Sequence, residues 1–483
     1  LSTETKQLIE QSNQRLNTIA NSGRPVYGIN TGFGIFANHV IDSSNIAKLN
    51  RNLILSHAVG IGEPLSSEIV RAAIFVRAAT LSKGFSGVRL LIIQTLLEML
   101  NKHVTPVVPS KESLGSSGDL CQLSHMALVL SKDEKDLAEE SGWAEVNGEK
   151  KTGKEAMNIA GIERVILSAK EGLALNNGAT FTAAIGALAV GTAEYYLSIA
   201  EISAALSMEA LCARSEAMDS RIHLARQQSG QIMTAQNVQQ LIAGSTFINS
   251  DARVQDAYSI RCVPQVHGAV RDTVEYVRKI VENEINAATD NPLIFEPDVA
   301  LSGGNFHGEP IGLVMDYLSI ALCELGAISE RRTNRLLDEK LNYGLPQMLV
   351  DNSNHAGLNS GLMMPHYTAA SLVLENQTLA TPDSIRSLPT SADQEDHNAN
   401  AMTAARHAFE ILQNIRQILS IEIYTAVRAI TLRKNTSNNN LGAGTNKIYN
   451  QIIQKVGFIP EDTLWGEEIK IINDMIVNKE IRV

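Results

Sequence analysis

The sequence predicts a mainly α-helical protein. Apolar residues recur at intervals of three and four over long stretches, whereas strand-like patterns are few and short. Polar, glycine-containing clusters separate the helical stretches. With 483 residues, the chain is long enough to bury a large core.

The predicted helices follow one another from residue 70 onward. Residues 70–102 repeat apolar side chains at helical spacing, with an interruption near Gly84 and Gly87. Residues 178–214 are rich in alanine and leucine and apolar on most faces, which predicts a helix inside a bundle or at a subunit interface. The same period recurs in residues 272–287, 310–341 and 401–433.

Three other segments predict less regular structure. Residues 104–108 suit a short strand, and the charged, glycine-containing residues 132–152 suit an excursion on the surface. The residues after Lys434 are polar and glycine-rich, which predicts a loop or an exposed segment.

The composition excludes several classes of protein. A net charge of -11 without a basic stripe argues against nucleic-acid binding. The long uncharged run 172–193 contains Asn176 and Asn177, which favours a buried helix over a membrane span. No signal peptide opens the chain, and the four cysteines are scattered, so we expect a cytoplasmic protein with reduced thiols. No metal-ligand spacing occurs, so we expect no metal site.

Eight polar clusters are unusual for turns between core helices. Singly, each fits a capped helix end, but together they supply a tyrosine, an arginine, amides, a histidine and a carboxylate. That inventory suits an enzyme acting on a small zwitterion. The clusters are YGINTGFG (27–34), LSHAVGIGEP (55–64), GSSGD (115–119), LNNG (175–178), QDAYSIRCVPQ (255–265), TDNPL (289–293), SGGNFHGEP (302–310) and SADQEDH (391–397).

In this order, from about residue 26 to residue 397, the clusters resemble the aromatic amino acid ammonia-lyase family, and most closely its histidine ammonia-lyase branch. The resemblance implies an elongated central helical bundle with a smaller N-terminal α+β part, as in the fumarase–aspartase-like fold. We expect an N-terminal domain over residues 1–170, the bundle over 171–435 and a C-terminal segment over 436–483. The resemblance also implies a homotetramer whose active sites draw residues from three subunits.

The resemblance implies a prosthetic group made from the chain itself, with no external cofactor. In the family, a tripeptide matching Ser116, Ser117 and Gly118 cyclises to the electrophile methylidene-imidazolone. Ser117 would supply the leaving hydroxyl and the methylidene carbon. Ser116 stands where the family usually has alanine, but its side chain stays outside the ring, so we expect cyclisation to proceed.

The resemblance also assigns roles around this group. Tyr27 would be the base that removes the β-proton, and Arg261 would bind the substrate carboxylate. Asn177 and Tyr258 would lie beside the prosthetic group, and Phe306 would pack near it. Taken alone, Tyr27 also fits a core tyrosine and Arg261 a salt bridge at a helix end.

The position of the substrate ring is the most informative part of the resemblance. His57 and Glu395 match the polar pair of the histidine branch, and a carboxylate can accept an N–H from an imidazole. We therefore expect L-histidine as substrate, and urocanate and ammonia as products. A purely structural pairing of His57 with Glu395 is the alternative. Gln255 and Asn305 would lie behind the residues that contact the substrate.

Departures from the family pattern keep other functions open. Asn176 replaces an apolar residue, and Cys121-Gln122 replaces the family's usual Ala-Pro. Residues 363–366 differ from the family's usual sequence at that place. Residues 398–400 read Asn-Ala-Asn where the family usually has Val-Ser-Met. The main alternative is an ergothionase-like lyase that eliminates trimethylamine from a histidine betaine without the prosthetic group. An aminomutase is disfavoured because those enzymes act on phenylalanine or tyrosine. The retained reactive residues argue against a non-catalytic helical scaffold.

Overall fold

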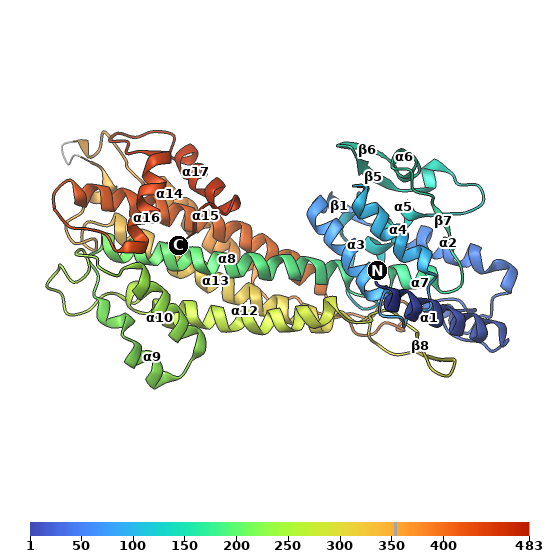
Figure 1. Cartoon of the computed structure of the whole chain (residues 1–483). Helices are drawn as coiled ribbons and strands as arrows, with labels where there is room; N and C mark the ends of the chain where they lie inside the picture. Colours follow the sequence, from blue (N-terminus) through green and yellow to red (C-terminus); the bar gives the residue numbers. More distant parts are fainter. Residues whose placement is uncertain (352–354, 483) are drawn as a thin grey trace. The chain divides into compact units, whose positions relative to one another are not determined.

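The structure is a computed structural model that describes residues 1–351 and 355–482. It confirms the mainly helical fold, and the strands among the described residues form small sheets in the N-terminal part and one hairpin (Figure 1). The chain contacts define two compact units. Unit 1 comprises Leu1–Leu188, Arg278–Asp316 and Pro382–Arg406, and unit 2 comprises Ala189–Val277, Tyr317–Thr381 and His407–Val483. The three consecutive domains expected from the sequence stay a prediction.

Unit 1 contains the shorter N-terminal helices and all the described strands. The helices are α1 (Thr3–Asn21), α2 (Ile46–His57), α3 (Ser67–Leu81), α4 (Leu90–Asn101), α5 (Leu120–Leu130), α6 (Gly153–Ile159) and α7 (Glu171–Asn176), with short 3-10 turns η1 (Gly34–Phe36), η2 (Ser43–Asn45) and η3 (Ala138–Glu140).

The interruption predicted near Gly84 and Gly87 separates α3 from α4. Both glycines have positive φ, of 77° and 71°. A Cβ atom on Gly84 would lie 3.0 Å from Leu8 Cβ, and one on Gly87 would lie 3.0 Å from Leu16 Cβ, so a side chain at either position would crowd α1. The glycines therefore both turn the chain and admit the first helix.

The strand predicted over residues 104–108 is the two-residue β2 (Thr105–Pro106). It pairs with β5 (Trp143–Val146), which forms a hairpin with β6 (Glu149–Thr152). The expected surface excursion thus contains this hairpin. Its Asn147-Gly148 turn has positive φ at both residues, the conformation that suits a two-residue hairpin loop.

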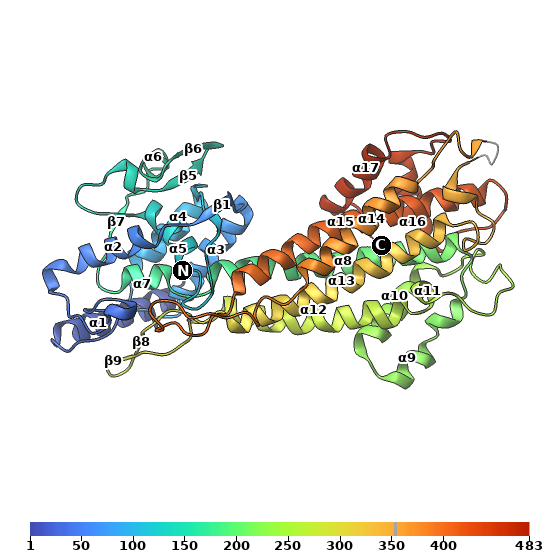
Figure 2. The ribbon, with the colours of Figure 1, turned by 180° about the vertical axis from the view of Figure 1, so that it is seen from behind.

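The remaining strands form three two-stranded sheets. They are β1 (Ile61–Pro64) with β3 (Pro109–Lys111), β4 (Ser131–Lys132) with β7 (Val165–Ile166), and β8 (Leu293–Phe295) with β9 (Val299–Leu301), the last pair visible in Figure 2. The β1–β3 pair leads into residues 113–119, and β8 begins at Leu293, the last residue of the TDNPL cluster.

Four long helices contain a boundary between the units, and each matches a helix predicted from the sequence. They are α8 (Thr180–Ala210), α12 (Val263–Ile285), α13 (Glu309–Leu337) and α15 (Ala401–Lys434). Within the described residues, α8 and α13 are long and apolar enough to cross a membrane by length and composition alone. Since 61% of each apolar window is buried inside the protein, both fit core helices equally well.

Unit 2 completes the fold with shorter helices. They are α9 (Ser220–Arg226), α10 (Ser229–Leu241), α11 (Tyr258–Arg261), α14 (Met363–Leu379), α16 (Ala443–Val456) and α17 (Trp465–Val477), with 3-10 turns η4 (Ser215–Met218) and η5 (Gln347–Leu349). The loop expected after Lys434 is shorter than the polar run in the sequence, because α16 already begins at Ala443.

A buried ion pair lies in the core of unit 2. Arg332 of α13 donates to both carboxylate oxygens of Glu422 of α15, at 2.5 and 2.9 Å, and both side chains are fully buried. Ser207 of α8 and Ser329 of α13 donate to the same carboxylate, at 2.7 and 2.6 Å. The carboxylate therefore ties three long helices together.

Replacing Arg332 with methionine is expected to lower the stability of the protein by about 3–5 kcal/mol, because Glu422 would be left as an uncompensated buried charge. The double variant Arg332→Met/Glu422→Leu should recover most of this loss. Chemical unfolding of the three proteins measures the effect, and a double variant no more stable than Arg332→Met would contradict the argument.

Candidate active site

Residues 113–119 form a tight loop between β3 and α5. Ser113 Oγ donates to Asp119 Oδ1 at 2.8 Å and accepts from the backbone N–H of Gly115 at 3.2 Å. The carboxylate of Asp119 also accepts two hydrogen bonds from Thr182, from the backbone N–H at 2.8 Å and from Oγ1 at 2.9 Å. Asp119 therefore fastens the loop to the first turn of α8.

The second half of this loop lies directly against Gly178. Gly118 and Gly178 form a parallel bridge, and Asp119 N donates to Gly178 O at 2.9 Å. A Cβ atom on Gly118 would lie 2.0 Å from the carbonyl carbon of Gly178, and Gly118 has a φ of 82°. Only glycine fits at position 118, for reasons both of space and of backbone conformation.

The carbonyl oxygen of Ser117 accepts two hydrogen bonds. Asn177 Nδ2 donates at 2.9 Å, and the backbone N–H of Gly178 donates at 3.0 Å. Two aligned donors on one carbonyl oxygen stabilise negative charge that develops there, as in an oxyanion hole.

Arg77 of α3 hydrogen-bonds to the backbone of Asn177. The guanidinium is fully buried and donates to Ala174 O at 3.2 Å, to Asn177 O at 2.9 Å and to Thr180 Oγ1. It therefore satisfies carbonyl groups at the C-terminal end of α7, where a positive charge is also favoured by the helix dipole. Sequence analysis missed Arg77, although an arginine with apolar residues on both sides in a helix was the available signal.

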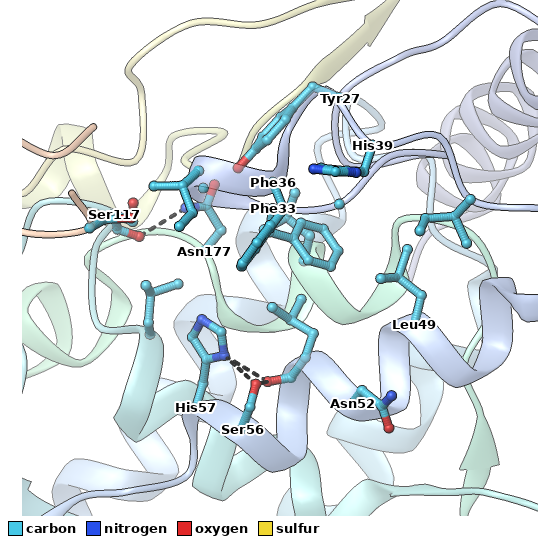
Figure 3. A pocket seen from close by; sticks show the side chains of 18 of the residues that line it. Tyr27, Phe33, Phe36, His39, Leu49, Asn52, Ser56, His57, Ser117 and Asn177 are labelled. Carbon is cyan, nitrogen blue, oxygen red and sulfur yellow. Dashed lines mark hydrogen bonds between the residues drawn. The ribbon is translucent and has the colours of Figure 1, made fainter. Parts of the chain in front are cut away.

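A cavity of about 690 Å³ opens above the loop within unit 1 (Figure 3). Tyr27, His57, Ser117, Asn177 and Glu395 all line it. A neighbouring hollow of about 540 Å³ shares four of these residues and adds Ser116, Phe306 and Gln394. The structure thus brings most of the predicted residues of unit 1 to these two cavities, whereas Asn305 lines neither of them. The larger cavity also has an aromatic wall that sequence analysis missed, formed by Phe33, Phe36 and His39.

His57 is held in one tautomer at the end of α2. Its Nδ1 lies 2.8 Å from the carbonyl oxygen of Leu53, which can only accept, so Nδ1 carries the proton. Burial lowers the pKa of His57, and the Leu53 carbonyl and the charge of Glu395 offset part of this shift. A neutral ring protonated at Nδ1 leaves Nε2 as a hydrogen-bond acceptor, and Figure 3 shows that nitrogen turned to the cavity.

Glu395 reaches the cavity from a strained turn. Ser391, Ala392 and Asp393 are three consecutive non-glycine residues with positive φ, between 51° and 64°. Each costs roughly 1–2 kcal/mol. Thr390 and Glu395 close the turn through two backbone hydrogen bonds, at 2.8 and 3.2 Å. Such strain is typical of functional sites.

The carboxylate of Glu395 accepts a hydrogen bond from Ser117 Oγ at 3.3 Å. The hydrogen bonds described for His57 go to Leu53 and Ser56 instead. Within the described residues, His57 and Glu395 therefore face one cavity without bonding to each other.

Tyr27 precedes the 3-10 turn η1 and packs edge-on against Phe33, with ring centroids 6.4 Å apart. Burial raises the pKa of Tyr27, and the negative charge of Glu395 raises it further, while a backbone contact with Gly34 lowers it in part. Within a single chain, the Tyr27 hydroxyl is therefore protonated at neutral pH.

Comparison with known proteins agrees with this geometry. The family model described as "Aromatic amino acid lyase" matches residues 1–454. The chain belongs to the aromatic amino acid lyase family. This confirms both the resemblance and the enzyme class.

The relatives of this lyase include a histidine ammonia-lyase from Caldanaerobacter subterraneus, which is 47% identical over 96% of this chain and 89% of its own. Among solved structures, histidine ammonia-lyase from Trypanosoma cruzi superposes with a TM-score of 0.89 at 37% identity, covering 99% of this chain and 88% of its own. Ergothionase from Treponema denticola superposes with a TM-score of 0.91 at 28% identity, covering 99% and 94%.

Three predicted residues of the lyase lie in unit 2 and form a group of their own. Tyr258 and Arg261 belong to the single turn α11, and the Arg261 guanidinium lies 4.8 Å from the centre of the Tyr258 ring. Arg261 also donates to Gln255 Oε1. The Tyr258 side chain is 71% exposed. Asn305, in unit 1, donates to Ala288 O at 3.3 Å.

Glu284 of α12 adds a second acid to the charges beneath the loop. Burial and the negative charge of Asp119 raise the pKa of Glu284, and the charge of Arg77 lowers it in part, which leaves the pKa at about 7. The native protein therefore holds this proton more tightly than the unfolded chain, where a glutamate titrates near 4.5. The stability that the proton contributes is complete below pH 4.5 and is lost as the pH rises through about 7.

Replacing Glu284 with glutamine is expected to stabilise the lyase relative to wild type increasingly between pH 5 and pH 8, by about 3 kcal/mol at the upper end. Unfolding midpoints of both proteins across this range measure the difference. The matched control is Glu275→Gln, at an exposed position on the same helix. A stability difference that does not change with pH would contradict the prediction.

Proposed function

We propose that this lyase eliminates ammonia from L-histidine to give urocanate. The observation that carries the proposal is the shared cavity in which His57 and Glu395 face the Ser117 loop. His57 Nε2 and the Glu395 carboxylate both accept hydrogen bonds, so either can accept from the N–H of a substrate imidazole, which a phenyl ring lacks. The relatives named histidine ammonia-lyases support the same substrate.

We propose that Ser116, Ser117 and Gly118 cyclise to methylidene-imidazolone, and the described residues fit that group. Position 118 admits only glycine, whose nitrogen would close the ring. The Ser117 oxygen, which would become the ring carbonyl, already accepts from Asn177 and Gly178. When formed, the group supplies an electrophilic carbon that makes departure of a poor amine leaving group feasible.

Tyr27 is proposed as the base that removes the β-proton of the substrate. A phenol with a raised pKa is a poor base at neutral pH, so the role requires a positive charge near its oxygen. In the proposed homotetramer, Arg261 of another subunit supplies that charge while its guanidinium binds the substrate carboxylate in a two-pronged manner. Tyr258 would arrive on the same turn, and Gln255 on the segment just before it.

Purified wild-type protein is expected to be lighter than its sequence by two waters, about 36 Da, because ring closure dehydrates the backbone twice. Ser117→Ala should keep the full mass and lose formation of urocanate from L-histidine. Intact mass and absorbance in the urocanate band measure both. An uncyclised protein that releases trimethylamine from a histidine betaine, and leaves L-histidine unchanged, would favour the ergothionase-like alternative.

Replacing Tyr27 with phenylalanine is expected to lower kcat/KM for L-histidine by about 10²–10⁴-fold, because the β-proton loses its acceptor. The mass deficit of two waters should persist, since the base plays no part in ring closure. Steady-state kinetics and intact mass together measure these effects. Full turnover by Tyr27→Phe would disprove the assignment of the base.

A further inference from the structure

The loop that carries Glu395 is closed at its base by Asn398. The backbone N–H of Asn398 donates to Ser387 Oγ at 2.9 Å, and its Oδ1 accepts from the backbone N–H of Leu388 at 3.0 Å. The side chain is 1% exposed. We call residues 387–398 the Glu395 loop.

The amide nitrogen of Asn398 makes a third contact, outside its own loop. Asn398 Nδ2 donates to Ser116 Oγ at 2.6 Å, and Ser116 is 5% exposed. The next residue, Ser117, donates to Glu395 at the tip of the same loop. The Glu395 loop therefore holds two consecutive serines of the tripeptide, one at its base and one at its tip.

Neighbouring backbone hydrogen bonds also hold the tripeptide loop in place. The backbone N–H of Asn400 donates to Leu114 O at 2.8 Å, and that of Gly308 donates to Gly115 O at 2.9 Å. On the other side, Asn177 and Gly178 hold the Ser117 oxygen. The peptide between Ser116 and Gly118 is thus fixed from both sides, and Asn398 makes the one side-chain contact described for Ser116 in residues 1–351 and 355–482.

We propose that Asn398 is a positioning residue that holds Ser116 for ring closure. The inference rests on the proposed cyclisation. A serine hydroxyl readily bonds to peptide groups of its own turn, whereas the hydrogen bond donated by Asn398 fixes the position of the Ser116 hydroxyl oxygen. The Ser116 carbonyl, attached to the same Cα, is then free to meet the nitrogen of Gly118.

The reaction that Asn398 assists balances without an external reactant. The Gly118 nitrogen bonds to the Ser116 carbonyl carbon, and the carbonyl oxygen leaves as water with the protons of the Gly118 and Ser117 nitrogens. The Ser117 hydroxyl then leaves as a second water with the proton of its own Cα, which forms the methylidene double bond.

The contact between Ser116 and Asn398 joins two of the departures named from the sequence, the serine and the Asn-Ala-Asn run. Removing one partner leaves a buried polar group without its hydrogen bond, whereas replacing both with apolar residues removes the need for it. The two positions should therefore behave as a coupled pair.

The test follows the rate of ring closure by intact mass, in chains sampled at intervals after synthesis in a cell-free translation system. Asn398→Val should close the ring at least about tenfold more slowly than wild type, because Ser116 loses its donor. The double variant Ser116→Ala/Asn398→Val should regain a rate close to wild type. Equal rates for Asn398→Val and wild type would overturn the proposal.

Two further variants separate positioning from folding. Asn398→Asp keeps an acceptor for Leu388 but cannot donate to Ser116, so it should also slow closure even if the valine variant fails to fold. Ser387→Ala weakens the base of the Glu395 loop and leaves the contact with Ser116, so it should close normally. Equal slowing by Ser387→Ala would overturn the proposal by assigning the effect to loop stability. A wild-type protein that never loses two waters would instead refute the proposed prosthetic group.

Discussion

The close approach of Gly118 to Gly178 is the constraint on which the site depends. Because neither glycine has a Cβ, the two backbone segments hydrogen-bond to each other directly. The Ser117 oxygen therefore comes within reach of Asn177 Nδ2 and Gly178 N. The same contact places the first turn of α8 where Asp119 can accept from Thr182. One backbone contact thus fixes the loop, its donors and the start of a long helix.

This constraint is supported by charges that are costly to bury. Arg77 is buried and donates to Asn177 O, and the buried ion pair of Lys170 with Asp290 lies in the same unit, where Ser86 also donates to Asp290 at 2.8 Å. Burial lowers the pKa of Arg77 to about 10, and the charges of Asp290 and Asp119 offset part of the shift. Buried pairs add little net stability, but their directional hydrogen bonds fix orientation, which a preformed pair of donors requires.

The sequence predicted what depends on local pattern and missed what depends on distant contacts. Helical periodicity identified the long helices, and Gly84 and Gly87 correctly marked the break between α3 and α4. The contact of Asn398 with Ser116 joins residues 282 positions apart, and no periodicity reveals such a pair. The left-handed turn before Glu395 has no glycine to announce it, so its geometry also needed the structure.

In the proposed homotetramer, the position of α11 links catalysis to assembly. Tyr27 has a raised pKa beside Glu395, so the cavity of one chain contains an acid where the proposed chemistry needs a base. Arg261, the cation suited to change this, belongs to unit 2 and is occupied with Gln255 and the exposed ring of Tyr258. If another subunit delivers this turn to the cavity, the same guanidinium lowers the pKa of Tyr27 and binds the substrate. The base then becomes active only where a complete site exists, so the tetramer would be a catalytic requirement and not only a means of burying apolar helices.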